Sequence, residues 1–153
     1  TSSVFTVGTY NNFDNDYVAY CFAEVEGYSK FGSYTGNVAD NGTFVHLGFK
    51  PAWIMIKCAS DTSDFTSWVI YDNVRKTINR PTDGDTSNPL YANKTAKEGE
   101  RGNGTTDISG NTMSVDFLSN GIKLRDNASE LNQEDTFVYM AFAEQPFKYA
   151  NAE

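Results

Sequence analysis

Few side chains in this sequence could support nucleophilic catalysis. The single histidine, His46, lies within the apolar run FVHLGF, where alternation places it on one face of an expected strand. The sequence contains no G-x-S-x-G motif, no cysteine–histidine arrangement, no HExxH, no CxxC pair and no phosphate-binding glycine loop. A lone histidine in a strand is usually a structural or surface residue. We therefore assign no catalytic residue and expect no cofactor.

Two glutamates offer the best case for acid–base chemistry. Glu24 and Glu144 occupy equivalent positions in two similar strings, and β-sandwich glycosidases place two carboxylates in one groove. Each glutamate, however, ends its expected strand, where a charge is usually a solvated residue at the rim. A glycosidase is therefore the third of our three functional hypotheses.

Acidic loops raise the question of a bound calcium ion, because hard cations prefer carboxylate and carbonyl oxygens. The aspartates concerned are Asp61, Asp64, Asp72, Asp83 and Asp85. Their spacing does not match the calcium-binding loop of an EF-hand. Soluble acidic loops are the simpler interpretation, and we predict no metal site.

Aromatic residues beside Gly, Lys or Asn could stack on sugar rings. The residues with such neighbours are Tyr28, Phe31, Tyr34, Tyr91, Phe147 and Tyr149. Ordinary burial statistics favour the interpretation that most of them close the ends of a hydrophobic core. From this set we take Tyr34 and Tyr91 as the candidate glycan contacts.

The apolar pattern that must position these residues is typical of β-structure. Short runs rich in Val, Ile, Tyr, Phe and Trp alternate with stretches rich in Gly, Asn, Asp, Ser and Thr. Strands are expected near residues 4–7, 17–25, 31–34, 44–49, 53–57, 68–72, 113–118, 122–125 and 137–144. The pair Asn120-Gly121 predicts a hairpin with a type I′ turn, which needs positive φ at both central residues. A short helix or turn near residues 72–78 is the only helical signal.

These runs predict an all-β fold, an antiparallel β-sandwich of two sheets with little or no helix. The core is expected to draw on apolar residues of the runs: Val18, Tyr20, Phe22, Trp53, Ile54, Ile56, Trp68, Ile70, Phe117, Val138, Met140 and Phe142. Where both faces of a run are apolar, alternation does not tell which face points inward. The length of 153 residues fits a single domain over residues 1–153. Within it, residues 79–111 are predicted to be a long variable loop that faces a partner.

The sequence also repeats part of itself. Residues 17–24 (YVAYCFAE) resemble residues 137–144 (FVYMAFAE), and both strings follow a polar loop. The likeness fits two equivalent strands close together in one sheet, or the tail of an upstream domain copy followed by a whole one. In either case we expect residues 1–25 to complete a sheet, within the chain or across a subunit boundary.

The charge of the sequence limits the classes of partner that we expect. The formal net charge is −8, and the densest basic stretch, VRKTINR at residues 74–80, carries only three positive side chains. Nucleic acid is therefore an unlikely partner in our interpretation, as is an anionic membrane. No apolar run approaches the length needed to cross a bilayer, so we predict no membrane insertion. Cys21 and Cys58 each lie in an apolar run and are either paired or free.

Long strings of this chain resemble one family. At YVAYCFAEVEGYSKFGSYTGN (residues 17–37) the sequence is similar to a recurrent, uncharacterised domain in structural proteins of marine tailed bacteriophages, including cyanophages and pelagiphages. The likeness continues through GFKPAWIMIK, WVIYDNVR, DFLSNGIKLR and FVYMAFAEQPFKYANA. The resemblance implies a concanavalin-like or laminin-G-like sandwich carried on virion fibres or surface proteins. It implies no catalytic motif, so we transfer no site residue from it.

The leading hypothesis is thus a non-enzymatic virion structural domain on a fibre, a knob or the capsid surface. The alternative is an adhesin that binds host surface polysaccharide. The expected partners are other virion proteins and further copies of this chain. A homo-oligomer is expected, and a trimer would suit a fibre, although the sequence does not fix the number of subunits.

Overall fold

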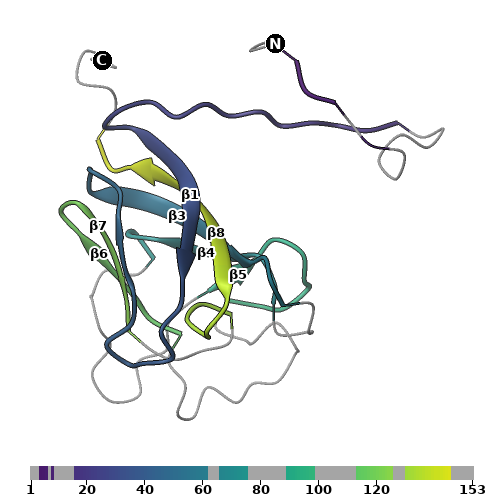
Figure 1. Cartoon of the computed structure of the whole chain (residues 1–153). Coiled ribbons are helices and arrows are strands. Elements are labelled where there is room, and N and C mark those ends of the chain that lie inside the picture. Colours follow the sequence, from purple (N-terminus) through teal and green to yellow (C-terminus); the bar gives the residue numbers. More distant parts are fainter. Residues whose placement is uncertain are drawn as a thin grey trace.

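The described residues form eight β-strands in two antiparallel sheets, which confirms the predicted all-β, two-sheet fold (Figure 1). The computed structural model describes residues 4–6, 8, 16–61, 66–75, 89–98, 113–125 and 130–145. The strands are β1 (Ser29–Thr35), β2 (Phe44–His46), β3 (Pro51–Cys58), β4 (Val69–Asp72), β5 (Leu90–Tyr91), β6 (Val115–Leu118), β7 (Gly121–Leu124) and β8 (Thr136–Ala143). No helix is present among these residues, and so none long and apolar enough to span a membrane.

The larger sheet has the strand order β1-β8-β3-β4-β5. β8 is the second strand of this order and pairs along its length with β1 on one side and β3 on the other. Its alternating burial follows from the period of two in a strand: Phe137, Tyr139 and Ala141 point into the interior. Val138 and Met140 point to the opposite face, which is apolar as well.

The smaller sheet has the order β2-β7-β6 and packs its apolar face against the larger one. β6 and β7 form the predicted hairpin, with Leu118 opposite Gly121 and a loop of Ser119 and Asn120. The predicted type I′ turn is wrong, because neither loop residue has positive φ. Gly121 is needed for space instead: a Cβ there would lie 2.2 Å from the carbonyl oxygen of Val45 on β2.

The hydrophobic core lies between the two sheets. Its fully buried side chains include Ile54, Ile56, Val69, Tyr71, Val115, Ile122, Leu124, Leu131 and Phe137. Two tyrosine hydroxyls tie the sheet to surrounding segments: Tyr71 donates to the carbonyl of Met113 (2.9 Å), and Tyr34 donates to that of Leu131 (2.7 Å). The phenol rings therefore fill the core while their polar ends find partners.

A buried asparagine fixes the loop between β1 and β2. Asn132 is fully buried, and its side-chain amide donates to Asn37 Oδ1 and to the carbonyl of Ala39, both at 2.9 Å. Its Oδ1 accepts from the backbone N–H of Asn37. Within this loop Val38 has a φ of 55°, a left-handed conformation that is strained for a β-branched residue. The hydrogen bonds of Asn132 hold the chain in that conformation.

The prediction fails in the N-terminal segment. Residues 4–6 and 17–24 form no strand, and Val25 makes only an isolated bridge to Ser29. The predicted core residues Val18, Tyr20 and Phe22 are therefore exposed, at 78%, 83% and 58%. A strand needs a neighbour that satisfies its backbone, and the described part of this chain provides none for residues 17–24.

Of the other nine predicted core residues, three are in the core. Ile54, Ile56 and Phe117 are buried as expected. The other predicted core residues lie on the outer face of the larger sheet, half-buried or exposed: Trp53, Trp68, Ile70, Val138, Met140 and Phe142. β5 was not predicted as a strand, and the structure shows only the turn at residues 73–75 of the expected helix or turn. Most of residues 79–111 and part of residues 72–78 lie outside the described residues.

Candidate functional site on the outer sheet face

An unbroken apolar row crosses the outer face of the larger sheet. The register places Phe31 opposite Met140, Met140 opposite Met55, Met55 opposite Ile70, and Ile70 opposite Leu90. All five side chains are half-buried or exposed rather than buried. We call this set the outer row. Where one face of a sheet is in contact with water, the side chains on that face are normally polar. Five apolar side chains in line therefore indicate a surface that something covers.

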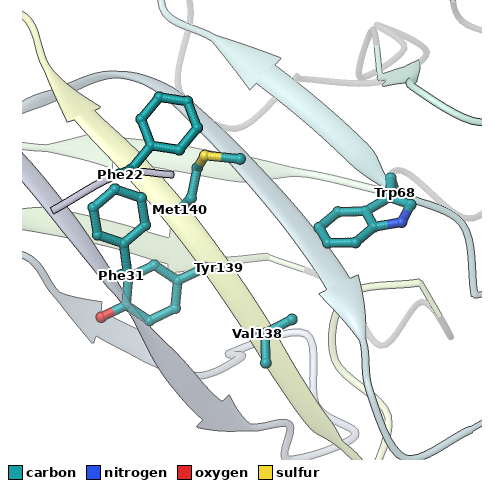
Figure 2. Close-up of a pocket in the computed structure, with 6 residues that line it drawn as sticks. All are labelled: Phe22, Phe31, Trp68, Val138, Tyr139 and Met140. Atoms are coloured by element: carbon teal, nitrogen blue, oxygen red, sulfur yellow. The ribbon is translucent and has the colours of Figure 1, made fainter. Parts of the chain in front are cut away.

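A groove lies along this face. Its lining consists of Phe22, Phe31, Trp68, Val138, Tyr139 and Met140, and it encloses about 230 Å³ (Figure 2). Figure 2 shows Phe22, Phe31 and Met140 gathered at one end and Trp68 at the other. Sites for small molecules usually enclose about 300–1,000 Å³. The groove is therefore closer in size to one or two side chains than to a free ligand.

One wall of the groove belongs to an aromatic cluster. The ring of Phe142 lies 5.9 Å from those of Phe22 and Tyr28 and 5.7 Å from that of Trp53, measured between centroids. Phe22 also stacks on Phe31 at 6.1 Å. Phe22 comes from the segment before the first strand, so this segment already places one ring on the outer face.

We call residues 16–24 the arm. Its end is fixed to β1: the carboxylate of Glu24 accepts the backbone N–H of Phe31, and the hydroxyl of Ser29 donates to the carbonyl of Ala23, both at 3.1 Å. Residues 25–28 then turn the chain into β1, with Gly27 at a φ of 74° as a type II turn requires. Burial and, secondarily, the Glu24 charge raise the pKa of Tyr139. Beyond Phe22 the arm runs away from the sheets (Figure 1).

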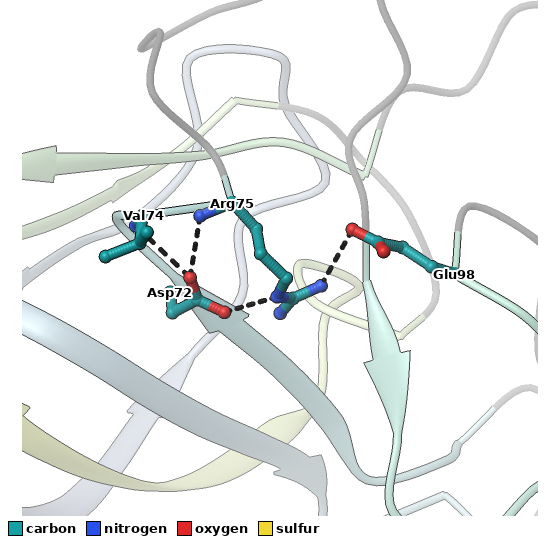
Figure 3. A network of polar contacts seen from close by, with 4 residues as sticks. All are labelled: Asp72, Val74, Arg75 and Glu98. Carbon is teal, nitrogen blue, oxygen red and sulfur yellow. Dashed lines mark hydrogen bonds and ion pairs between the residues drawn. The ribbon is translucent and has the colours of Figure 1, made fainter.

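Charged groups gather at the rim of the outer face. Asp72, which ends β4, accepts the backbone N–H groups of Val74 and Arg75 and pairs with the Arg75 guanidinium (Figure 3). Arg75 in turn contacts Glu98 at 3.1 Å. Partial burial alone would raise the pKa of Asp72, but the hydrogen bonds and charge of Arg75 outweigh it and lower that pKa. Asp72 is thus a structural carboxylate rather than a free ligand.

All of these residues lie within one sequence range that matches a family model. Residues 1–146 match the model of a single protein family, the domain of unknown function DUF7483. The chain belongs to that family. The matched range includes the arm and all eight strands, so the DUF7483 domain comprises both. Searches of curated proteins and of solved structures found no match.

The predicted glycan contacts are in the core of the DUF7483 domain. Tyr34 is 9% exposed and Tyr91 is 6% exposed, and the Tyr91 hydroxyl lies 3.6 Å from the sulfur of Met113. The expectation that these rings face solvent is wrong, so neither can stack on a sugar in this conformation. Of the other candidate rings, Phe31 is on the outer face and Tyr28 packs against Phe142, whereas Phe147 and Tyr149 lie outside the described residues.

The remaining candidates are not brought together into a reactive site. Glu24 is bound to β1, while Glu144 pairs with Lys50 (2.6 Å) and accepts a hydrogen bond from Asn73. His46 is exposed on β2. Both cysteines are free, Cys21 being exposed and Cys58 buried. Among the described residues no acidic, histidine and cysteine group is arranged to hold a metal; Asp64, Asp83 and Asp85 lie outside them.

Sequence reasoning missed the outer face because it assigned its residues to the core. Trp68 and Val138 are apolar residues in apolar runs, and local sequence does not separate the two faces of such a run. One signal in the sequence could have indicated this face. The strings of β3 and β8 contain more apolar residues than one buried face requires, because both of their faces are apolar, whereas an antiparallel sheet with one solvated face needs only one apolar face.

Proposed function

We propose that this chain is a non-enzymatic structural domain of a tailed-phage virion, displayed on a fibre, a knob or the capsid surface. In this proposal its work is contact with other virion subunits through the outer face of the larger sheet. The observation that carries the proposal is the outer row, five apolar side chains aligned across five strands. The resemblance to phage structural proteins supports the virion location.

The chemistry of the outer face favours docking over catalysis. The groove is lined by aromatic and aliphatic side chains, and the nearby carboxylates Asp72 and Glu144 are held by ion pairs. A contact between subunits needs apolar area and shape, both of which this face offers. Because the whole chain carries a net charge of −8, this mostly apolar face is also the surface through which identical copies repel each other least.

Immunogold electron microscopy tests the location. Antibodies against the purified domain should label intact particles of the phage that encodes it, at a repeated position on a fibre or on the capsid. Particles of an unrelated tailed phage are the control. Label on infected cells but none on purified particles would contradict the proposal.

A glycan-binding adhesin is the second candidate, and Trp68 favours it. Its indole is 37% exposed at the open end of the groove, a suitable position for stacking on a sugar ring. A glycan array should then show saturable binding that Trp68→Ala abolishes. Tyr91→Phe is the matched control, because it alters a buried ring and should leave binding unchanged. Binding that survives Trp68→Ala would argue against this site.

A further inference from the structure

The arm has apolar side chains of which only one packs against the sheet. Alternate residues of an extended segment share a side, so an extended arm places Val18, Tyr20 and Phe22 on one side and Ala19 and Cys21 on the other. Phe22 packs against Phe31 and Phe142, whereas Tyr20 and Val18 remain among the most exposed apolar residues of the described chain. Burying such side chains is favourable by about 25 cal/mol per Å² of apolar surface.

The groove also has apolar surface that the arm does not cover. One end is filled by Phe22 of the arm, while the other end keeps Trp68 and Val138 exposed at 37% and 36%. The arm and the groove are thus already in contact through one ring. Each has unused apolar surface directly beside that contact.

The dimensions of the two surfaces agree. Residues 17–21, which precede Phe22, span about 17 Å at about 3.3 Å per residue when extended. The outer row crosses four strand spacings of about 4.8 Å, or about 19 Å. These five residues are therefore long enough to cover most of the outer row of a second copy.

We infer that the arm of one copy packs across the outer face of the larger sheet of a second copy. Tyr20 and Val18 then contact the end of the groove formed by Trp68 and Val138. The partner is a second copy, because Phe22 anchors the arm to its own groove and the part of the arm that precedes it leads away from its own sheets (Figure 1). If the exchange is reciprocal, the two copies use the same surfaces, as in a twofold assembly.

This inference rests on the proposed function, since it names the partner of the same face. It can fail separately. A monomeric chain that is still present on virions would overturn the arm exchange alone, and a self-associating chain that is absent from virions would overturn only the virion assignment.

Sedimentation equilibrium of the full chain tests the exchange. We expect concentration-dependent association, with Tyr20→Asp weakening it by about tenfold or more, as expected for a buried aromatic anchor at an interface. Ala19→Asp is the matched control, because it adds the same charge to the other side of the arm and should change association little. Trp68→Ser, checked for an unchanged fold by circular dichroism, should weaken association to a similar degree.

A label on Cys21 provides a second measurement. Cys21 is exposed and Cys58 is buried, so a thiol-reactive spin label should attach to the arm alone. Labels on two copies should then show a dipolar distance that disappears in Tyr20→Asp. A chain that remains monomeric over the accessible concentrations, or equal effects of Tyr20→Asp and Ala19→Asp, would overturn the inference.

Discussion

β8 and the arm have closely similar sequences but different structures. Residues 137–143 lie in β8, which is paired on both sides, and residues 17–24 form no strand at all. Val, Phe, Ala and Glu recur at the same positions of both strings. The difference lies in the neighbours: β8 lies between β1 and β3, whereas the arm touches its own domain only near its end. The comparison shows that an apolar alternating string forms a strand only where other strands supply the hydrogen bonds.

The largest effect should come from the first equivalent pair of residues. Phe137 is fully buried, so Phe137→Ala should lower the free energy of unfolding by about 3–5 kcal/mol. Tyr17 is 58% exposed, so Tyr17→Ala should change it by less than about 0.5 kcal/mol. Urea denaturation of dilute protein measures both values. Similar losses for the two variants would mean that the arm is folded into its own domain.

A substitution at the end of β4, away from the arm, should lower the free energy of unfolding. Asp72→Asn removes the charge that pairs with Arg75, and we expect a loss of about 1–2 kcal/mol near neutral pH. Because folding lowers the pKa of Asp72, its stabilisation is complete above the pKa of the unfolded chain and is lost as the pH falls through the folded value. The two proteins should therefore converge in acid. Asp40→Asn, at an exposed residue, is the control and should show no such convergence.

Two equivalent phenylalanines contact each other, which allows a direct measurement of how firmly the arm is attached. A double-mutant cycle of Phe22→Ala and Phe142→Ala should give a coupling of about 0.5–1.5 kcal/mol, the range for aromatic pairs. The measurement is again the free energy of unfolding at low protein concentration. Strict additivity would show that Phe22 does not rest on the outer face in solution.

The smallest effects should distinguish the two glutamates. Glu144→Gln breaks the ion pair with Lys50, and we expect a loss of up to about 1 kcal/mol that decreases at high salt. Glu24→Gln should cost less and show little salt dependence, because an amide oxygen can still accept the N–H of Phe31. Thermal unfolding at low and high salt compares them. A salt-sensitive loss in Glu24→Gln would show that the arm is held by charge.

Local sequence predicted the fold class well and the surface poorly. The hairpin of β6 and β7 and the strands around Ile54 and Ile56 follow from apolar runs separated by turn residues, which are local signals. The arm could not be distinguished from β8, because the pairing partner of a strand is set by residues far away in the sequence. The prediction of a type I′ turn was wrong because position 121 requires glycine for a different reason. The backbone of Val45 lies too close for a side chain there, and turn geometry plays no part.

The candidate site shows the same limit. Tyr34 and Tyr91 stand beside small or polar residues, which suggested exposed rings. Their environments depend on Leu131 and Met113, which are 97 and 22 residues away along the chain. Conversely, Phe22 and Trp68 looked like core residues because they stand in apolar runs. Only the register of five strands shows which apolar side chains share a face that the second sheet does not cover.

The position of β8 between β1 and β3 also has a consequence for synthesis. Ribosomes make a chain from its N-terminus, and β1 and β3 have no strand between them until residues 136–143 have emerged. Until then both strands present backbone groups that β8 will later occupy, and such unpaired edges readily bind other chains. Nascent chains on one messenger are therefore exposed to mispairing until β8 has been made. Chains truncated before β8 should accumulate as insoluble protein rather than as a smaller soluble domain.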